Sequence, residues 1–91
     1  MLILISYDIE NDKTRTKLAK RLLDFGPRVQ FSVFEADVKE AELSKLQHVC
    51  AATDLKGDDS IRLYRLCEGC RSRIVLYGAG KKTEDQAFYI A

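Results

Sequence analysis

The feature that most constrains this chain is the apolar run at its N-terminus, residues Met1–Tyr7 (MLILISY). A run that is short and rich in Ile and Leu is typical of a strand with apolar side chains on both faces. We predict that this strand is central in its sheet. The run is far shorter than the roughly 20 residues of a membrane span, and no basic segment precedes it. We therefore expect a cytoplasmic protein.

The next pattern predicts an amphipathic helix. Asn11 and Asp12 offer oxygens that can cap its first turn, and Gly26 with Pro27 ends it. Apolar residues recur at helical spacing and form a stripe that should face a core: Leu18, Ala19, Leu22, Leu23 and Phe25.

Four more segments have regular patterns. Residues 28–38 (RVQFSVFEADV) alternate as a strand does, bent into two short pieces, and residues 39–53 form a second amphipathic helix. Residues 60–66 (SIRLYRL) predict a half-exposed strand, and residues 73–77 (RIVLY) predict another. Residues 86–90 (QAFYI) can add a last short strand.

The order strand, helix, strand pair, helix, strand predicts an α+β protein with a ferredoxin-like βαββαβ sandwich. The 91 residues correspond to one domain, with a core at about residues 1–78. Both helices of this fold cover the same face of the sheet, although the first strand is apolar on both faces. A second copy of the chain can cover the other face, so we predict a homodimer.

Composition limits the functional classes. Fifteen Lys and Arg against fourteen Asp and Glu give a net charge of +1, so nucleic-acid binding has to depend on local patches. Three cysteines are too few for a disulfide framework and fit a reducing compartment. No Walker loop, GxGxxG or HExxH motif is present.

Asp8 is the first candidate functional residue, because it directly follows the apolar strand and shares a face with Leu4 and Ser6. Two copies of Asp8 near a two-fold axis could bind magnesium or manganese. Such a metal could activate water against a phosphodiester. The alternative is that Asp8 caps the following turn or helix.

Basic residues form two clusters: Lys13, Arg15, Lys17, Lys20 and Arg21 in the first helix, and Arg62, Arg65, Arg71 and Arg73 around the later strand. They can bind phosphates, or they can be ordinary solvated surface. Tyr7, Phe31 and Phe34 could stack on bases, although core packing better explains Phe31.

Cys67 and Cys70 form one CxxC motif. Zinc needs four ligands, and neither His48 nor Cys50 has zinc-finger spacing to them. A thioredoxin-like motif opens a helix after a strand, whereas Glu68-Gly69 is typical of a turn between strands. We predict a structural turn.

Four stretches together resemble the CRISPR-associated Cas2 protein family. They are residues 7–9 (YDI), 11–18 (NDKTRTKL), 25–35 (FGPRVQFSVFE) and 59–67 (DSIRLYRLC). The ordered set at these spacings covers essentially the whole chain. One departure is Lys39, where a serine cap is usual before the second helix.

The resemblance implies a ferredoxin-like homodimer that acts with the Cas1 integrase when new spacers are inserted. It also implies a metal-dependent endonuclease on single-stranded RNA or double-stranded DNA, with Asp8 as the ligand of Mg²⁺ or Mn²⁺. The tail, about residues 79–91, resembles a terminal strand that pairs with the other subunit.

Other motif positions of that family would shape the catalytic cleft beside Asp8, and they are occupied here by Tyr7, Ser32 and Phe34. Arg15 and Arg28 are implied phosphate contacts. Lys17 and Arg21, on the basic side of the first helix, complete the predicted nucleic-acid-binding set.

Two functions from different classes remain open. The first is a dimeric metal-dependent phosphodiesterase. The second is a non-catalytic DNA-binding scaffold that holds integrase subunits, with Asp8 structural. A small-molecule regulatory module and an RRM-type RNA binder are disfavoured, because a Gly-rich ligand loop and an RNP-like aromatic octapeptide are missing.

Overall fold

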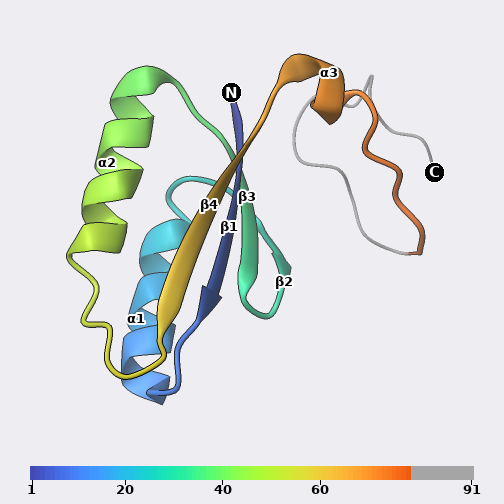
Figure 1. The fold of residues 1–91 in the computed structure, drawn as a ribbon. Helices are drawn as coiled ribbons and strands as arrows, with labels where there is room; N and C mark the ends of the chain where they lie inside the picture. Colours follow the sequence, from blue (N-terminus) through green and yellow to red (C-terminus); the bar gives the residue numbers. More distant parts are fainter. Residues whose placement is uncertain (79–91) are drawn as a thin grey trace.

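The computed structural model of the protein describes residues 1–78. Its elements follow one another along the chain as β1 (Leu2–Asp8), α1 (Asp12–Leu22), β2 (Arg28–Gln30), β3 (Val33–Asp37), α2 (Glu40–Ala51), β4 (Ser60–Leu66) and α3 (Glu68–Arg71) (Figure 1).

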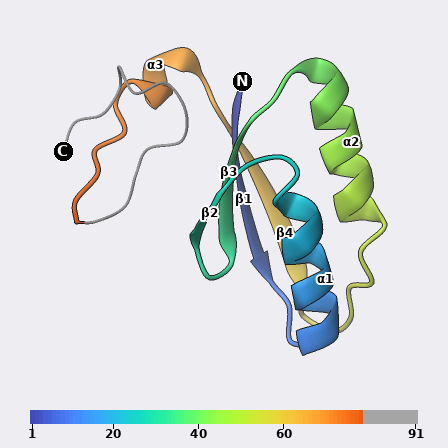
Figure 2. The ribbon, with the colours of Figure 1, turned by 180° about the vertical axis from the view of Figure 1, so that it is seen from behind.

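The four strands form one antiparallel sheet in the order β2-β3-β1-β4. The apolar strand β1 is therefore central, as its composition predicts. Helices α1 and α2 lie on the same side of the sheet, as the view from behind shows (Figure 2). This arrangement confirms the α+β class and the ferredoxin-like βαββαβ fold.

The core lies between the sheet and these two helices. Alternation along β1 directs Ile3, Ile5 and Tyr7 into it, and each is at most 3% exposed. The facing residues are equally buried and come from α1, β3 and α2: Leu18, Leu22, Phe34, Ala36 and Leu46. Burying one such aliphatic side chain contributes about 1.5–3 kcal/mol, so this layer holds the helices on the sheet.

Both long helices begin at a cap. Oδ1 of Asn11 accepts a hydrogen bond from the Thr14 N–H at 3.0 Å, which satisfies one free donor of α1. Lys39 precedes α2, and the carboxylate of Glu42 accepts a hydrogen bond from the Lys39 N–H at 3.0 Å. The missing serine cap before α2 is therefore compensated from within the helix.

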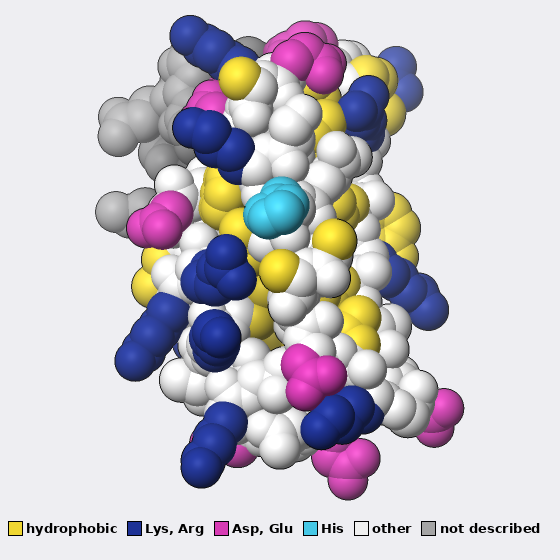
Figure 3. Space-filling model, turned by 90° about the vertical axis from the view of Figure 1, so that its left-hand side faces the viewer, with side chains coloured by type: hydrophobic (Ala, Val, Ile, Leu, Met, Phe, Trp, Pro, Cys, Tyr) yellow, Lys and Arg dark blue, Asp and Glu magenta, His cyan; other side chains and the backbone are white. Residues whose placement is uncertain are grey.

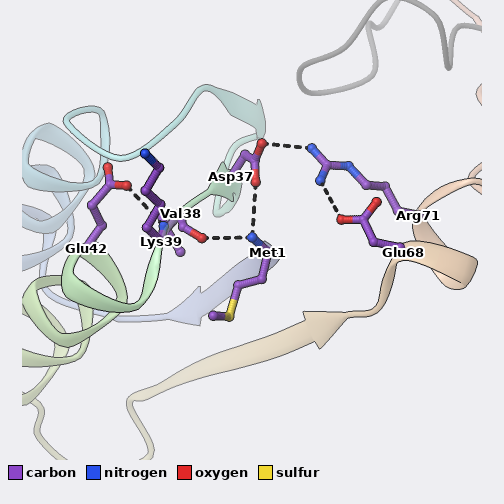
Figure 4. A network of polar contacts seen from close by, with 7 residues as sticks. All are labelled: Met1, Asp37, Val38, Lys39, Glu42, Glu68 and Arg71. Carbon is purple, nitrogen blue, oxygen red and sulfur yellow. Dashed lines mark hydrogen bonds and ion pairs between the residues drawn. The ribbon is translucent and has the colours of Figure 1, made fainter.

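The opposite face of the sheet, here called the open face, carries alternate residues of β1, including Leu4, Ser6 and Asp8. At one end of this face, Arg71 of α3 is only 6% exposed and pairs with Asp37 at 3.0 Å and with Glu68 at 3.2 Å (Figure 4). Helix α3 is thereby held against β3.

Two expectations about packing are wrong. Residues 73–77 form no strand, because no strand of the described part of the chain pairs with them, and Tyr77 is 88% exposed. Leu23 does not widen the stripe of α1, since it lies at the helix end and is 60% exposed.

The predicted strand at 86–90 and the dimer-pairing tail at 79–91 lie outside the described residues. None of the helices within residues 1–78 has the length and apolar character that crossing a bilayer requires.

Candidate carboxylate site and nucleic-acid interface

Asp8 is the last residue of β1, and its side chain is exposed. Only β4 flanks it, with Ser60 opposite, because the pairing of β1 with β3 ends at Ser6. Within residues 1–78 the Asp8 carboxylate takes part in no hydrogen bond or ion pair. Asn11 caps α1 instead, so the capping explanation of Asp8 fails.

Tyr7, the preceding residue, points the other way into the core and is 3% exposed. Its ring lies 6.3 Å from that of Phe34, which is fully buried, and its hydroxyl donates to the Phe31 carbonyl at 3.2 Å. Neither ring is available to a nucleobase, so the expectation that these two rings stack on bases is wrong. They fix the β2–β3 turn to the end of β1.

Phe31 and Ser32 form that two-residue turn, and the Ser32 carbonyl accepts a hydrogen bond from the Tyr7 N–H at 3.1 Å. Phe31 is 92% exposed, so the expected core packing is wrong. Its position at the tip of the hairpin exposes it, because the alternation of strand residues stops there.

A cavity of about 470 Å³ lies between α1 and this turn, and its lining brings together four of the predicted site residues: Tyr7, Arg15, Arg28 and Ser32. The guanidinium of Arg28 also lies 5.3 Å from the centroid of the Phe34 ring. Asp8 does not line this cavity. Lys20 of the predicted basic cluster and Phe31 also line it, although neither is among the predicted site residues.

Arg15 has a structural role at the edge of the cavity. Its guanidinium donates to the carbonyls of Ile9 and Glu10 at 2.9 and 3.2 Å and pairs with Asp12 at 2.6 Å. These contacts brace the loop between β1 and α1. The predicted phosphate contact of Arg15 stays a prediction.

Lys17 and Arg21 lie elsewhere, on the side of α1 that faces the end of α2. Together with Lys13 and residues 52–54 they line a hollow of about 260 Å³. The three cations are exposed at a spacing of four residues, and none has an ion-pair partner among residues 1–78. Lys and Arg side chains gather along the lower left of Figure 3. We call Lys13, Lys17 and Arg21 the basic face.

The second predicted basic cluster does not form one surface. Arg71 is buried against Asp37 and Glu68. Arg62 lies on the open face, opposite Ser6, where its side chain contacts that of Tyr64.

The expected cysteine turn between strands is also different in the structure. β4 ends at Leu66, and Cys67 is the residue that caps the one-turn helix α3. The order is therefore strand, CxxC, helix. A helix of four residues is too short for a periodic signal, so the sequence pattern could not distinguish it from a turn.

Relatives of known identity agree with this architecture. The family model of CRISPR associated protein Cas2 matches residues 1–74. A protein of Chloroflexus aurantiacus, named CRISPR-associated endoribonuclease Cas2 3, is 42% identical over 90 residues, which cover 99% of this chain and 97% of that one.

Solved structures extend the likeness to three dimensions. Streptococcus pyogenes Cas2 is 34% identical and superimposes with a TM-score of 0.72, over 86% of this chain and 100% of that one. A chain of a partial Cas6-RT-Cas1–Cas2 complex is 32% identical, with a TM-score of 0.63, over 81% of this chain and 87% of that one. Because the family model covers most of the chain and the fold agrees, this protein belongs to the CRISPR-associated Cas2 family.

Proposed function

We propose that this chain is a dimeric, divalent-metal-dependent endonuclease of CRISPR adaptation that cleaves phosphodiesters of single-stranded RNA or double-stranded DNA and acts with the Cas1 integrase. The observation that carries this proposal is the exposed Asp8 carboxylate, which follows a buried central strand and makes no polar contact within residues 1–78. The naming of its relatives as endoribonucleases supports the same conclusion.

One chain supplies only half of a metal site. No group of three or more His, Cys, Asp or Glu side chains suited to a metal ion occurs within residues 1–78. A single carboxylate binds a hard cation weakly, whereas two Asp8 side chains facing each other across a two-fold axis give it two oxygen-donor groups. Mg²⁺ or Mn²⁺ bound there would supply Lewis-acid stabilisation of the charge that develops on the phosphoryl group.

The open face is the surface through which the two copies would meet. It presents Leu4 and Leu66, both half-buried, and Tyr64, which is 45% exposed. The charged side chains Glu35 and Arg62 lie on the same face. An isologous dimer places each charge near the partner's copy of the surface, so Arg62 can pair with a carboxylate of the other subunit. This pairing would bring two Asp8 residues together at the end of the sheet.

Nucleic acid would be held by the basic face. Lys13, Lys17 and Arg21 lie on one side of α1 without neutralising partners among the described residues, so they can bind successive phosphates. Contacts of this kind position a strand without selecting its sequence.

The second candidate function is a DNA-binding scaffold for Cas1. A solved relative is a chain of a partial Cas6-RT-Cas1–Cas2 complex, and the scaffold function needs only the dimer and the basic face. In this case the carboxylate of Asp8 would take no part in catalysis.

Asp8→Asn separates the two functions. The substitution removes the charge that a cation needs while keeping the side-chain shape, and we expect folding and dimerisation to be unchanged. Glu10→Gln is the matched control, because it removes an exposed carboxylate two residues away. In Mn²⁺, Asp8→Asn should lower cleavage of both RNA and duplex DNA by at least about a hundredfold, or about 2.7 kcal/mol, and Glu10→Gln should not.

Heterodimers provide a stricter test. If the metal is shared, one Asp8→Asn subunit should inactivate the whole dimer. Full cleavage by the Asp8→Asn homodimer would contradict the enzyme proposal. An inactive wild type together with normal spacer insertion by Cas1 and Asp8→Asn would favour the scaffold.

A further inference from the structure

Two exposed thiols meet at the start of α3. The Cys70 N–H donates a hydrogen bond to Sγ of Cys67 at 3.3 Å, and the two side chains also contact each other. Cys67 is the capping residue of the helix, and Cys70 follows one turn later. Both thiols are free and accessible to solvent, whereas the third cysteine, Cys50, is half-buried on α2.

The two thiols differ in acidity. The hydrogen bond from the Cys70 N–H lowers the pKa of the Cys67 thiol, and the side-chain contact adds to this effect. The same contact raises the pKa of Cys70. Burial raises the pKa of Cys50. Cys67 is therefore the thiol that most readily becomes the nucleophilic thiolate.

A bond between these two sulfurs requires a small movement of the turn. Side chains three residues apart on a helical turn have Cβ atoms about 5–6 Å apart, and a disulfide needs about 3.5–4.5 Å. A tightening of about 1 Å is feasible in a single exposed turn that is followed by residues without regular structure. A zinc site would need two further ligands, and no metal-binding cluster occurs within residues 1–78.

We propose that Cys67 and Cys70 form a reversible dithiol–disulfide pair that exchanges with small-molecule disulfides. The Cys67 thiolate attacks one sulfur of the oxidant RSSR, which forms a mixed disulfide and releases RS⁻. Cys70 then loses its proton and attacks Sγ of Cys67, which expels the second thiolate. The protein loses two electrons and two protons, and RSSR becomes two RSH.

This turn also holds the buried Arg71. The Arg71 N–H donates to the Cys67 carbonyl at 2.8 Å, and its guanidinium reaches Asp37 on β3 (Figure 4). Tightening of the Cys67–Cys70 turn therefore acts directly on the contact between α3 and the open face.

The test exposes the reduced full-length protein to oxidised glutathione and follows intact mass and alkylation by peptide mapping. We expect the wild type to lose two hydrogen atoms, to protect Cys67 and Cys70 from alkylation and to leave Cys50 alkylatable. Dithiothreitol should reverse the change. Cys70→Ser should stop at a mixed disulfide of glutathione with Cys67. In Cys67→Ser, glutathionylation of Cys70 should be slower than that of Cys67 in Cys70→Ser, because only the sulfur at position 67 accepts the hydrogen bond from the backbone N–H of residue 70.

Circular dichroism of each variant checks the fold. Two free thiols that persist in the wild type would overturn the proposal, and so would equal glutathionylation of Cys67 and Cys70 in the single variants. Zinc that copurifies at one ion for two chains and is released by thiol alkylation would also overturn it, in favour of a metal site shared by two subunits.

Discussion

Replacing Gly26 by alanine should destabilise this protein more than its small size change suggests. A Cβ atom at Gly26 would lie 2.0 Å from the Glu35 carbonyl oxygen and 2.8 Å from Cα of Ala36. Both atoms belong to the backbone of β3, which cannot rotate away as a side chain can. Gly26 is therefore needed for the close approach of the α1–β2 loop to the sheet.

The magnitude follows from the overlap. Ordinary contact begins at 3.4 Å, so the loop and β3 must separate by about 1.4 Å. That movement breaks the 3.1 Å hydrogen bond from the Glu35 N–H to the Pro27 carbonyl, which contributes about 0.5–1.5 kcal/mol. Overpacking adds about 1–3 kcal/mol. A loss of about 1.5–4.5 kcal/mol is a large part of the roughly 5–14 kcal/mol expected for a chain of this length.

Urea denaturation at fixed protein concentration measures this loss of unfolding free energy. In thermal denaturation, Tm should fall by about 10–25 °C. Two other glycines are matched controls. Gly57→Ala meets no atom within 4 Å and costs only the positive φ of 57°, about 1–2 kcal/mol. Gly69→Ala lies in α3, 3.8 Å from Sγ of Cys67, and should be neutral or slightly stabilising. A Gly26→Ala loss no larger than that of Gly57→Ala would refute the steric argument.

Three other perturbations have defined outcomes. The N–H groups of Glu10 and Lys56 lower the pKa of Asp59, so its contribution to stability is present above the unfolded pKa and is lost as pH falls through the folded pKa. Asp59→Asn should therefore flatten the acid limb of a stability-against-pH curve, and an unchanged limb would contradict this. The double variant Lys17→Glu and Arg21→Glu should weaken the binding of unrelated duplexes equally and reduce the slope of log binding constant against log salt concentration by about 2. An unaltered slope would show that the basic face is ordinary solvated surface. Tyr7→Phe should lower the free energy of unfolding by about 0.5–1.5 kcal/mol, because the hydrogen bond of the hydroxyl is lost. The same variant should reduce cleavage far less than Asp8→Asn does. A loss of cleavage as large as that of Asp8→Asn would assign the hydroxyl a chemical role.

Much of the fold could be predicted because its signals are local. The apolar run of β1, the apolar stripe of α1 and the cap at Asn11 are each contained within a short stretch of sequence. The hairpin could not be predicted in detail. Residues 28–38 alternate as one strand, but the turn at Phe31 and Ser32, with an irregular register between Arg28 and Gln30, changes which side chains face outward.

The candidate site was predictable in part for a related reason. Alternation along β1 correctly leaves Asp8 exposed on the face of Ser6. A motif orders residues along the chain, however, and does not say which face each side chain occupies. Tyr7 and Phe34 accordingly lie in the core, and the strand expected at residues 73–77 has no partner, because pairing depends on neighbours that a local pattern does not contain.

Tyr7 and Asp8 are consecutive residues of β1 whose side chains lie on opposite faces of the sheet, one in the core and one exposed. Tyr7 is held in the core by a ring contact and two hydrogen bonds, so the adjacent Asp8 is carried by a residue that is anchored in the core. Exposed residues far from this end of β1, such as those at the N-terminal end of α2, can therefore change during evolution without moving this carboxylate. Changes in the size of Phe34, far from solvent, would displace it.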